Sequence, residues 1–188
     1  MEHRMCSGQQ RLIDEVIERG LCVRCGACVG FCPYFSFFDG EVVVTDTCQA
    51  DSERCFEVCP VAAGTESSLR ASQTDEGEGI GKTADIVMAR SMRPDIMKRS
   101  QYGGVVSTLL TYALEKGRIQ SAILTTRDNT FSPYGIEVWD HGGIAQCSGS
   151  RYTASGTLSA LNRALKQGHR QVGVVGLPCQ MTALARMA

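Results

Sequence analysis

The spacing of the cysteines constrains this chain more than any other feature. Seven of its ten cysteines lie between residues 22 and 59. They form the run Cys22-x2-Cys25-x2-Cys28-x3-Cys32-Pro33, followed by Cys48, Cys55 and Cys59-Pro60. Three thiolates separated by two residues each can wrap one face of a cubane iron–sulfur cluster, while a fourth cysteine before a helix-stopping proline points toward a second cluster. The spacing therefore predicts iron–sulfur clusters and a protein that moves single electrons.

Two other uses of these cysteines fit the sequence less well than a bacterial-type ferredoxin module. A zinc ribbon would show two separated C-x2-C knuckles. A disulfide framework would need an oxidising compartment, and residues 1–10 are polar and lack the apolar region of a signal peptide. Because clusters need free thiols, we expect a cytoplasmic protein.

The second half of the module departs from the two-cluster pattern, because Ser52 stands where a cysteine is expected. Pairing as in two-cluster ferredoxins completes the first cluster and leaves three thiolates for the second. The first set is Cys22, Cys25, Cys28 and Cys59, and the second is Cys32, Cys48 and Cys55. The second site then holds a 3Fe-4S cluster, or a 4Fe-4S cluster with Asp51, Ser52 or an outside group as fourth ligand. Alternatively, only one cluster is present and the spare cysteines are buried thiols.

Composition excludes several classes of protein. The chain has 188 residues, of which 43% are hydrophobic and 21% charged, and its formal net charge is −1. These values fit one large or two small globular domains. The 19 basic and 20 acidic residues are interspersed, so we expect no nucleic-acid partner. Apolar stretches are interrupted well before the length of a membrane span, so none is expected.

The pattern of residues divides the chain into three parts. Residues 1–66 are predicted to form the ferredoxin-like 4Fe-4S module, with an amphipathic helix at residues 9–19 and a hairpin strand at 42–44. The helix is expected to pack on its own module rather than on a partner. Residues 67–83 lose their apolar character and are predicted to be a linker. Residues 84–188 are predicted to form an α/β domain, so that the fold class is α+β.

Short apolar runs and helical periodicity alternate in this last part. The expected strands are residues 86–89, 119–125, 135–140 and 172–175. The expected helices are residues 105–115 and 158–166, which end at Gly117 and Gly168. Alternation of this kind predicts an α/β layer with parallel strand pairing.

Three glycine-bearing turns could contact a ligand. Gly103-Gly104 precedes a predicted helix, whose N-terminal amides can bind an anion such as a phosphate. The turn from Gly149 to Tyr152 combines hydroxyls, a cation and an aromatic ring, although this motif by itself favours a helix cap with surface polar residues. Residues 176–180 follow a buried strand, where open α/β sheets bind ligands. No G-x-G-x-x-G follows a strand, so a Rossmann dinucleotide site is not indicated.

These features together resemble the coenzyme F420 hydrogenase/dehydrogenase beta-subunit family. The resemblance rests on the segments CVRCGACVGFCP, CFEVCP, YGGVVSTLLTYALEKGRIQSAIL, GSRY and VVGLPCQMTAL, in this order. It runs through most of the chain. Members of the family usually continue well past the PCQ segment, so we expect a fragment, a split gene or a variant that a partner chain completes.

The resemblance implies an oxidoreductase subunit that binds FAD, exchanges a hydride with coenzyme F420 and passes single electrons through 4Fe-4S clusters. It also implies that residues 84–188 are an incomplete α/β flavin-binding domain. A flavin is needed because a hydride carries two electrons and a cubane accepts one. The reacting group is then the flavin, with no catalytic side chain assigned. The implied partner is a hydrogenase, a formate dehydrogenase or a heterodisulfide-reductase-like complex. The implied cofactor-binding residues are Gly103, Gly104, Ser107, Gly149, Ser150, Arg151, Tyr152, Pro178 and Cys179.

Two other functions stay open, namely a non-catalytic iron–sulfur relay subunit and a reductase of the same family that acts on another acceptor. For Cys179 a structural or cluster-adjacent role is expected rather than that of a nucleophile. Cys6 and Cys147 lack a partner at ligand spacing and are expected to be structural thiols. The histidines His3, His141 and His169 form no recognisable metal or triad pattern.

Overall fold

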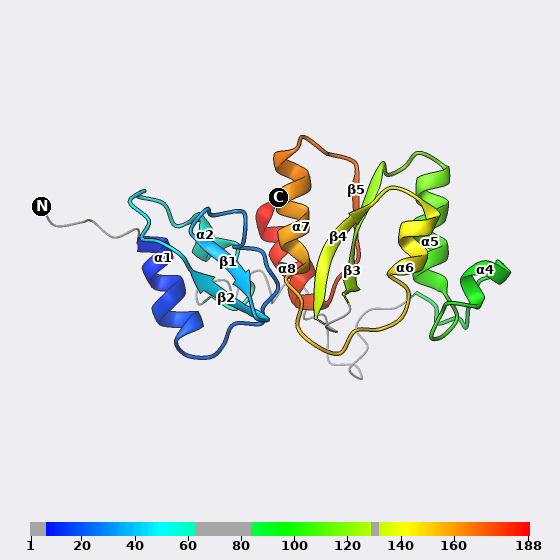
Figure 1. Ribbon diagram of the computed structural model, residues 1–188, viewed down its shortest axis with the longest axis horizontal. Coiled ribbons are helices and arrows are strands. Elements are labelled where there is room, and N and C mark those ends of the chain that lie inside the picture. The colour runs from blue at the N-terminus through cyan, green and yellow to red at the C-terminus, as the bar shows by residue number, and fades with distance from the viewer. Residues whose placement is uncertain (1–6, 63–83, 129–131) are drawn as a thin grey trace, which may run out of the picture.

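The computed structural model describes residues 7–62, 84–128 and 132–188 and shows an α+β protein. Figure 1 shows a small N-terminal part beside a larger layered part. In the larger part a three-stranded sheet lies between helices α7 and α8 on one side and α5 and α6 on the other. The predicted linker, Cys6 and His3 fall outside the described residues.

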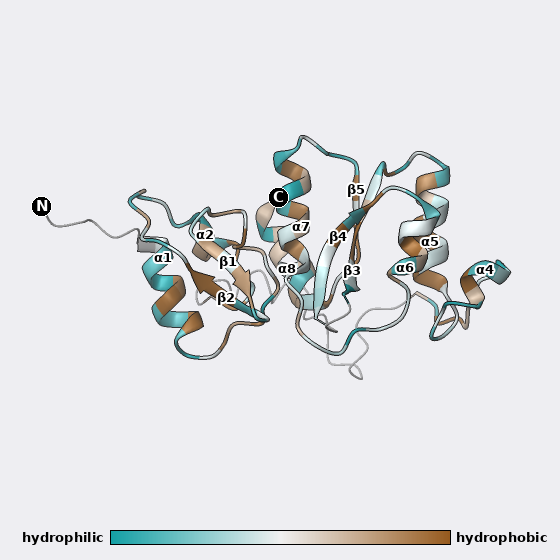
Figure 2. Ribbon diagram, in the orientation of Figure 1, coloured by the Kyte–Doolittle hydropathy of each residue, from teal (hydrophilic) through white to brown (hydrophobic). Residues whose placement is uncertain are grey.

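The N-terminal module, residues 7–62, is built on a short helix and a hairpin. Helix α1 (Ser7–Leu12) continues into a π-helical turn (Ile13–Ile17), and β1 (Phe35–Phe38) pairs antiparallel with β2 (Glu41–Val44). Helix α2 (Arg54–Glu57) is a single turn. Hydrophobic residues line both hairpin strands (Figure 2). Leu12 and Val16 are buried against this hairpin, which confirms that the predicted helix packs on its own module.

The sheet of the larger part has the order β4-β3-β5. Strand β3 (Ser121–Arg127) pairs antiparallel with β4 (Pro133–Val138) and parallel with β5 (Val172–Val174). The prediction of parallel pairing is therefore confirmed for β5 and wrong for β4. The cause is the short connection between β3 and β4, which can only turn the chain back, because a parallel partner needs a long crossover.

Both faces of β3 are buried. Ile123 packs with α7 (Thr157–Lys166) and α8 (Pro178–Met187), while Ala122 and Leu124 pack with Ile144 of α6 (His141–Gln146). Successive strand residues point to opposite faces, so one strand serves both hydrophobic layers. Leu110 of α5 (Val105–Glu115) joins the second layer, and α4 (Pro94–Met97) lies at the far end of this part (Figure 1).

One predicted strand does not form. Residues 86–89 run without regular structure, and the side chains of Ile86, Val87 and Met88 are exposed. The other predicted strands and helices of this part are present, with bounds shifted by up to two residues. A strand needs a neighbour as well as apolar residues, and no described strand lies beside this run.

The N-terminal module and the larger part share contacts through α7. Leu158 N donates a hydrogen bond to Cys25 O at 3.1 Å, and Asn162 Nδ2 donates to Ala27 O and Val29 O at 2.8 Å each. Gly26, with a φ of 82°, lies so close to Gly156 that an added Cβ would be 2.6 Å from its carbonyl oxygen. The cysteine loop is therefore held directly by the start of α7.

Within the described ranges, no helix combines the length and apolar character that a bilayer crossing requires.

Candidate redox site

Four of the predicted ligand cysteines gather at one place. Cys22, Cys25, Cys28 and Cys59 line the same small cavity of about 20 Å³, together with Leu12 and Val16 of the N-terminal helix. These four are the cysteines that the spacing assigns to the first cluster. The loop from Cys22 to Cys28 and the end of the α2 turn supply them, so residues 31 or more positions apart in the sequence meet here.

The environment of these thiols disfavours free thiolates. Burial is the main cause that raises the pKa of Cys25 to about 12, and repulsion from Cys59, Cys179 and Cys22 adds to it. Burial likewise raises the pKa of Cys28 and of Cys59. Buried thiols that repel one another as anions need a cation to become thiolates, and an iron–sulfur core supplies that charge. The donor set therefore fits a cluster.

The other three predicted ligands do not line this cavity. Cys48 and Cys55 are buried and Cys32 is half-buried in the module core. The Cys48 amide donates to Gln9 Oε1 at 2.7 Å. In the described ranges no three His, Cys, Asp or Glu side chains converge on a point for a single ion. The second cluster stays a prediction. No disulfide links any of the nine described cysteines.

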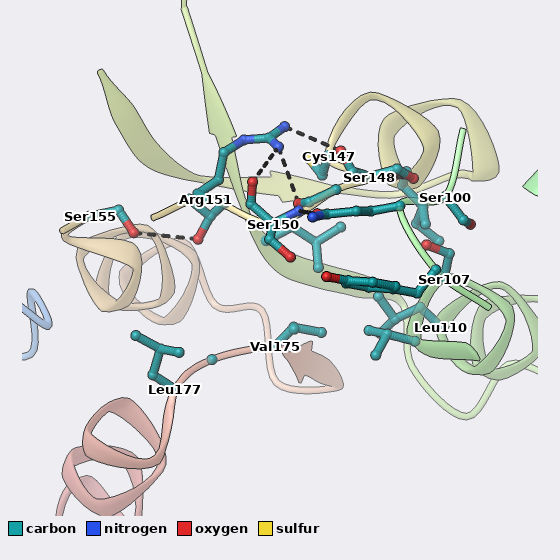
Figure 3. Close-up of a pocket in the computed structure, with 18 of the residues that line it drawn as sticks. Ser100, Ser107, Leu110, Cys147, Ser148, Ser150, Arg151, Ser155, Val175 and Leu177 are labelled. Atoms are coloured by element: carbon teal, nitrogen blue, oxygen red, sulfur yellow. Dashed lines mark hydrogen bonds between the residues drawn. The ribbon is translucent and has the colours of Figure 1, made fainter. Parts of the chain in front are cut away.

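A second, larger cavity of about 580 Å³ opens at the ends of β3 and β5. Its walls come from six segments, and Figure 3 shows some of their side chains. Thr125 and Val175 lie at the strand ends, Leu110 projects from α5, and Leu177 and Cys179 lie at the start of α8. Ligands of open α/β sheets bind in this kind of crevice. The volume lies within the usual range for small-molecule and cofactor sites.

The first glycine turn forms one end of this cavity. Gly103, Gly104 and Ser107 all line it, and Gly104 begins α5 with a φ of 68°. A Cβ on Gly103 would be 2.7 Å from Ala89 O. The N-terminus of an 11-residue helix therefore faces the cavity, where its amides can bind an anionic group such as a pyrophosphate.

The second glycine turn also lines the cavity, but Arg151 is used differently from the prediction. Its Nη1 donates to Gly149 O and Ser150 O at 3.1 and 3.3 Å, and its Nη2 donates to Ser148 O at 3.3 Å (Figure 3). The guanidinium therefore binds the carbonyls of its own turn. Because those carbonyls are engaged, the turn is held in one conformation toward the cavity, and Arg151 acts on the pocket through the turn.

Two predicted pocket residues do not line the cavity. Tyr152 is 83% exposed, and its hydroxyl accepts a hydrogen bond from Gln101 Nε2 at 2.9 Å. Pro178 begins α8 just outside the lining. Cys147, expected to be a structural thiol, does line the cavity, and burial raises its pKa.

Sequence reasoning missed two glutamines. Gln101 Oε1 accepts from Ser150 N at 2.8 Å, so its amide ties the first glycine turn to the second. Gln180 is buried, and its Oε1 accepts from Leu177 N at 2.8 Å while its Nε2 donates to Ser155 O at 3.4 Å. The PCQ segment contained the signal for Gln180. Nothing local in the sequence marks Gln101.

The two cavities are neighbours. Val23, next to the ligand cysteine Cys22, lines both of them. Cys179 lines the larger cavity and lies close enough to Cys25 to raise its pKa. At the other end of α8, Arg186 Nη1 donates a hydrogen bond to Cys59 O. A group bound in the larger cavity would therefore be separated from the four cysteines by single side chains.

Comparison with known proteins gives consistent matches. Residues 86–162 match the family described as coenzyme F420 hydrogenase/dehydrogenase, beta subunit N-terminal part. A coenzyme F420-dependent sulfite reductase of Methanocaldococcus jannaschii is 31% identical over 177 residues, which are 93% of this chain and 26% of that protein. The coenzyme F420 hydrogenase subunit beta of Methanosarcina barkeri is 35% identical over 109 residues, 57% of this chain and 38% of that subunit.

Two further matches extend the comparison. One subunit of the F(420)H(2) dehydrogenase of Methanosarcina mazei is 27% identical over 180 residues, 91% of this chain and 49% of that subunit. A solved F420-reducing [NiFe] hydrogenase complex from Methanosarcina barkeri aligns with a TM-score of 0.49 at 34% identity, covering 52% of this chain and 34% of that one. The chain thus spans between about a quarter and a half of the length of these relatives. By these matches the chain belongs to the coenzyme F420 hydrogenase/dehydrogenase beta-subunit family.

Proposed function

We propose that this chain is part of an oxidoreductase that exchanges a hydride between coenzyme F420 and FAD and passes single electrons to or from a 4Fe-4S cluster. The larger cavity binds FAD, and Cys22, Cys25, Cys28 and Cys59 hold the cluster. The observation that carries the proposal is the shared wall at Val23, because electron transfer requires the two sites to be close. The relatives named for F420-dependent activity support the choice of coenzyme F420.

Different residues of the larger cavity bind different parts of FAD. Amides at the start of α5 bind the negatively charged pyrophosphate, since Gly103 and Gly104 leave them unobstructed. The turn that Arg151 and Gln101 hold presents the Ser148 and Ser150 side chains to polar parts of the cofactor. Leu124, Val175 and Leu177 supply apolar wall that excludes water from a flat ring system. Bound FAD would supply chemistry that accepts a hydride as an electron pair and releases electrons singly.

The proposal divides the chain as the sequence suggests. Residues 1–66 form the iron–sulfur module, residues 67–83 connect, and residues 84–188 contribute the flavin-binding part. The electrons then pass to or from a partner subunit of a hydrogenase, a formate dehydrogenase or a similar redox complex. Several relatives carry subunit names, which supports a partner.

The test is the cofactor content of protein purified without oxygen. We expect FAD close to one per chain together with iron and sulfide, and turnover with reduced coenzyme F420 but not with nicotinamide. Iron and sulfide without flavin would support an electron-relay subunit instead. Flavin with turnover on another donor would support a reductase of the same family with a different substrate.

A pair of cysteine variants tests the cluster assignment. Cys25→Ala should lose the iron and sulfide of the first cluster, because three thiolates remain at a site built for four. FAD should remain measurable in this variant. Cys147→Ala is the matched control, since Cys147 lines only the larger cavity, and it should keep its iron. Unchanged iron in Cys25→Ala would refute the assignment of this ligand.

A further inference from the structure

Arg186 has an unusual environment beside the cysteine site. Its Nη1 donates to Cys59 O, whereas its Nε and Nη2 are buried and have no hydrogen-bond partner among the residues that the structure describes. No ion pair between Arg186 and an acidic side chain is found in that part of the chain either. Among residues 7–62, 84–128 and 132–188, two donors of a permanently charged group are therefore buried without an acceptor.

The guanidinium of an arginine is always charged in proteins. Burying a charge without a counter-charge is costly, and natural proteins place an anion or an acceptor beside it. Two arginines of the N-terminal module have such partners: Arg11 pairs with Glu15 and Glu53, and Arg24 pairs with Glu41. No described acidic side chain plays this part for Arg186, so we look for another anion beside it.

The nearest candidate for that anion is the four-cysteine site. Cys59, whose carbonyl binds Arg186, lines the small cavity together with Cys22, Cys25 and Cys28. Four thiolates around a cubane core leave a net negative charge on the assembly, which the guanidinium can stabilise. Arg151, the other arginine with a buried unpaired atom, differs because three backbone carbonyls already accept from it.

We propose that Arg186 raises the reduction potential of the cluster held by Cys22, Cys25, Cys28 and Cys59. This inference rests on the proposed function, because it requires the cluster at that site. Reduction adds one electron to the cluster, from reduced FAD, which would be oxidised by one electron, or from dithionite in a titration, and no bond in the cluster is made or broken. The negative charge beside Arg186 grows by one unit, so the reduced state gains more from the guanidinium than the oxidised state does. Arg186 thereby favours electron flow from the flavin cavity into the cluster.

The test is an anaerobic redox titration of the reconstituted full chain. Arg186→Gln removes the charge but keeps an N–H donor for Cys59 O, whereas Arg186→Lys keeps the charge. We expect the midpoint potential of Arg186→Gln to be lower than that of the wild type. The equilibrium constant for reduction should fall roughly tenfold, which corresponds to about 59 mV for one electron. Arg186→Lys should stay close to the wild type.

Arg170→Gln serves as the matched control. Arg170 is exposed and, like Arg186, donates to backbone carbonyls, those of Leu165 and His169, and its replacement should leave the midpoint unchanged. Equal midpoints for Arg186→Gln and Arg186→Lys at equal iron content would overturn the inference. Loss of iron in Arg186→Gln but not in Arg186→Lys would also overturn it, because the residue would then assemble the site rather than tune it. Wild-type protein that binds no iron and sulfide would refute the proposed function itself.

Discussion

Single glycines determine the shape of the larger cavity. Gly104 occupies the left-handed region of backbone space and packs closely, since a Cβ there would lie 2.5 Å from Ser100 Oγ and 2.7 Å from Ile96 Cγ2. Gly117 at the other end of α5 has a similar φ of 62°, but nothing lies within 4 Å of its Cβ position. A side chain added at Gly117 would therefore bear backbone strain alone, whereas one added at Gly104 would bear the same strain and also clash with its neighbours.

Gly104→Ala should destabilise the fold and lose FAD. The left-handed conformation alone costs a residue with a side chain about 1–2 kcal/mol, and the clash with Ser100 and Ile96 shifts the turn that lines the cavity. Gly117→Ala bears a similar strain without touching the cavity, so it should lower the free energy of unfolding and keep its FAD. Denaturant unfolding and FAD content per chain measure the two effects. Equal FAD content in both variants would contradict a role for Gly104 in the pocket.

Helix α7 is the element that joins the cysteine loop to the sheet. Its residues Leu158, Leu161 and Ala164 are buried in the same cluster as Cys25 and Ala27. Asn162 on this helix is 3% exposed and supplies the hydrogen bonds to Ala27 O and Val29 O. A polar side chain buried at this point satisfies two backbone carbonyls of a loop that has no regular structure of its own.

Asn162→Leu should destabilise the protein and loosen the cysteine loop. One buried and one partly buried carbonyl lose their donor, at a cost of about 1–3 kcal/mol for the buried one and less for the other. We expect a lower free energy of unfolding and faster loss of iron to a chelator. Lys166→Ala, an exposed substitution on the same helix, should change the free energy of unfolding by less than about 0.5 kcal/mol. Iron loss at the wild-type rate in Asn162→Leu would show that the loop holds its shape without α7.

Local patterns are sufficient to predict most elements of this fold. Helix α5 has the bounds that the sequence predicts, because Gly104 and Gly117 mark both of its ends. The same kind of reasoning fails for residues 86–89 and for the direction of β4, since both depend on which strand lies alongside. Helices α6 and α8 are not among the predicted elements, although Asp140 is a recognisable N-cap that accepts from Gly143 N.

The candidate site is only partly predictable for the same reason. The glycine turns and the cysteines carry signals in their own residue types and spacing. Gln101 and Val23 carry none, because their importance comes from contacts between segments far apart in the chain. The sequence predicts that Arg151 meets a ligand, yet the nearest acceptors are the carbonyls of its own turn.

At the scale of the whole molecule, the four-cysteine site and the larger cavity are mechanically connected. Val23 belongs to the walls of both. Gly26 also packs closely against the backbone of Gly156, which follows the cavity-lining residues 153–155. A cluster that fixes the loop from Cys22 to Cys28 therefore fixes part of the larger cavity as well. Two sites that share an ordered segment are coupled, and the coupling free energy is the same in both directions.

Removal of iron should consequently weaken FAD binding. We expect the dissociation constant of FAD to rise about fivefold or more when a chelator has removed the cluster, because the free loop must then be ordered by the flavin alone. FAD fluorescence titration of iron-loaded and iron-free protein measures this, with circular dichroism to verify that both forms are folded. By reciprocity, bound FAD should slow or reduce iron loss by a corresponding free energy. Cys25→Ala should bind FAD as weakly as the chelated wild type, and FAD affinities that do not depend on iron would show that the shared wall transmits nothing between the sites.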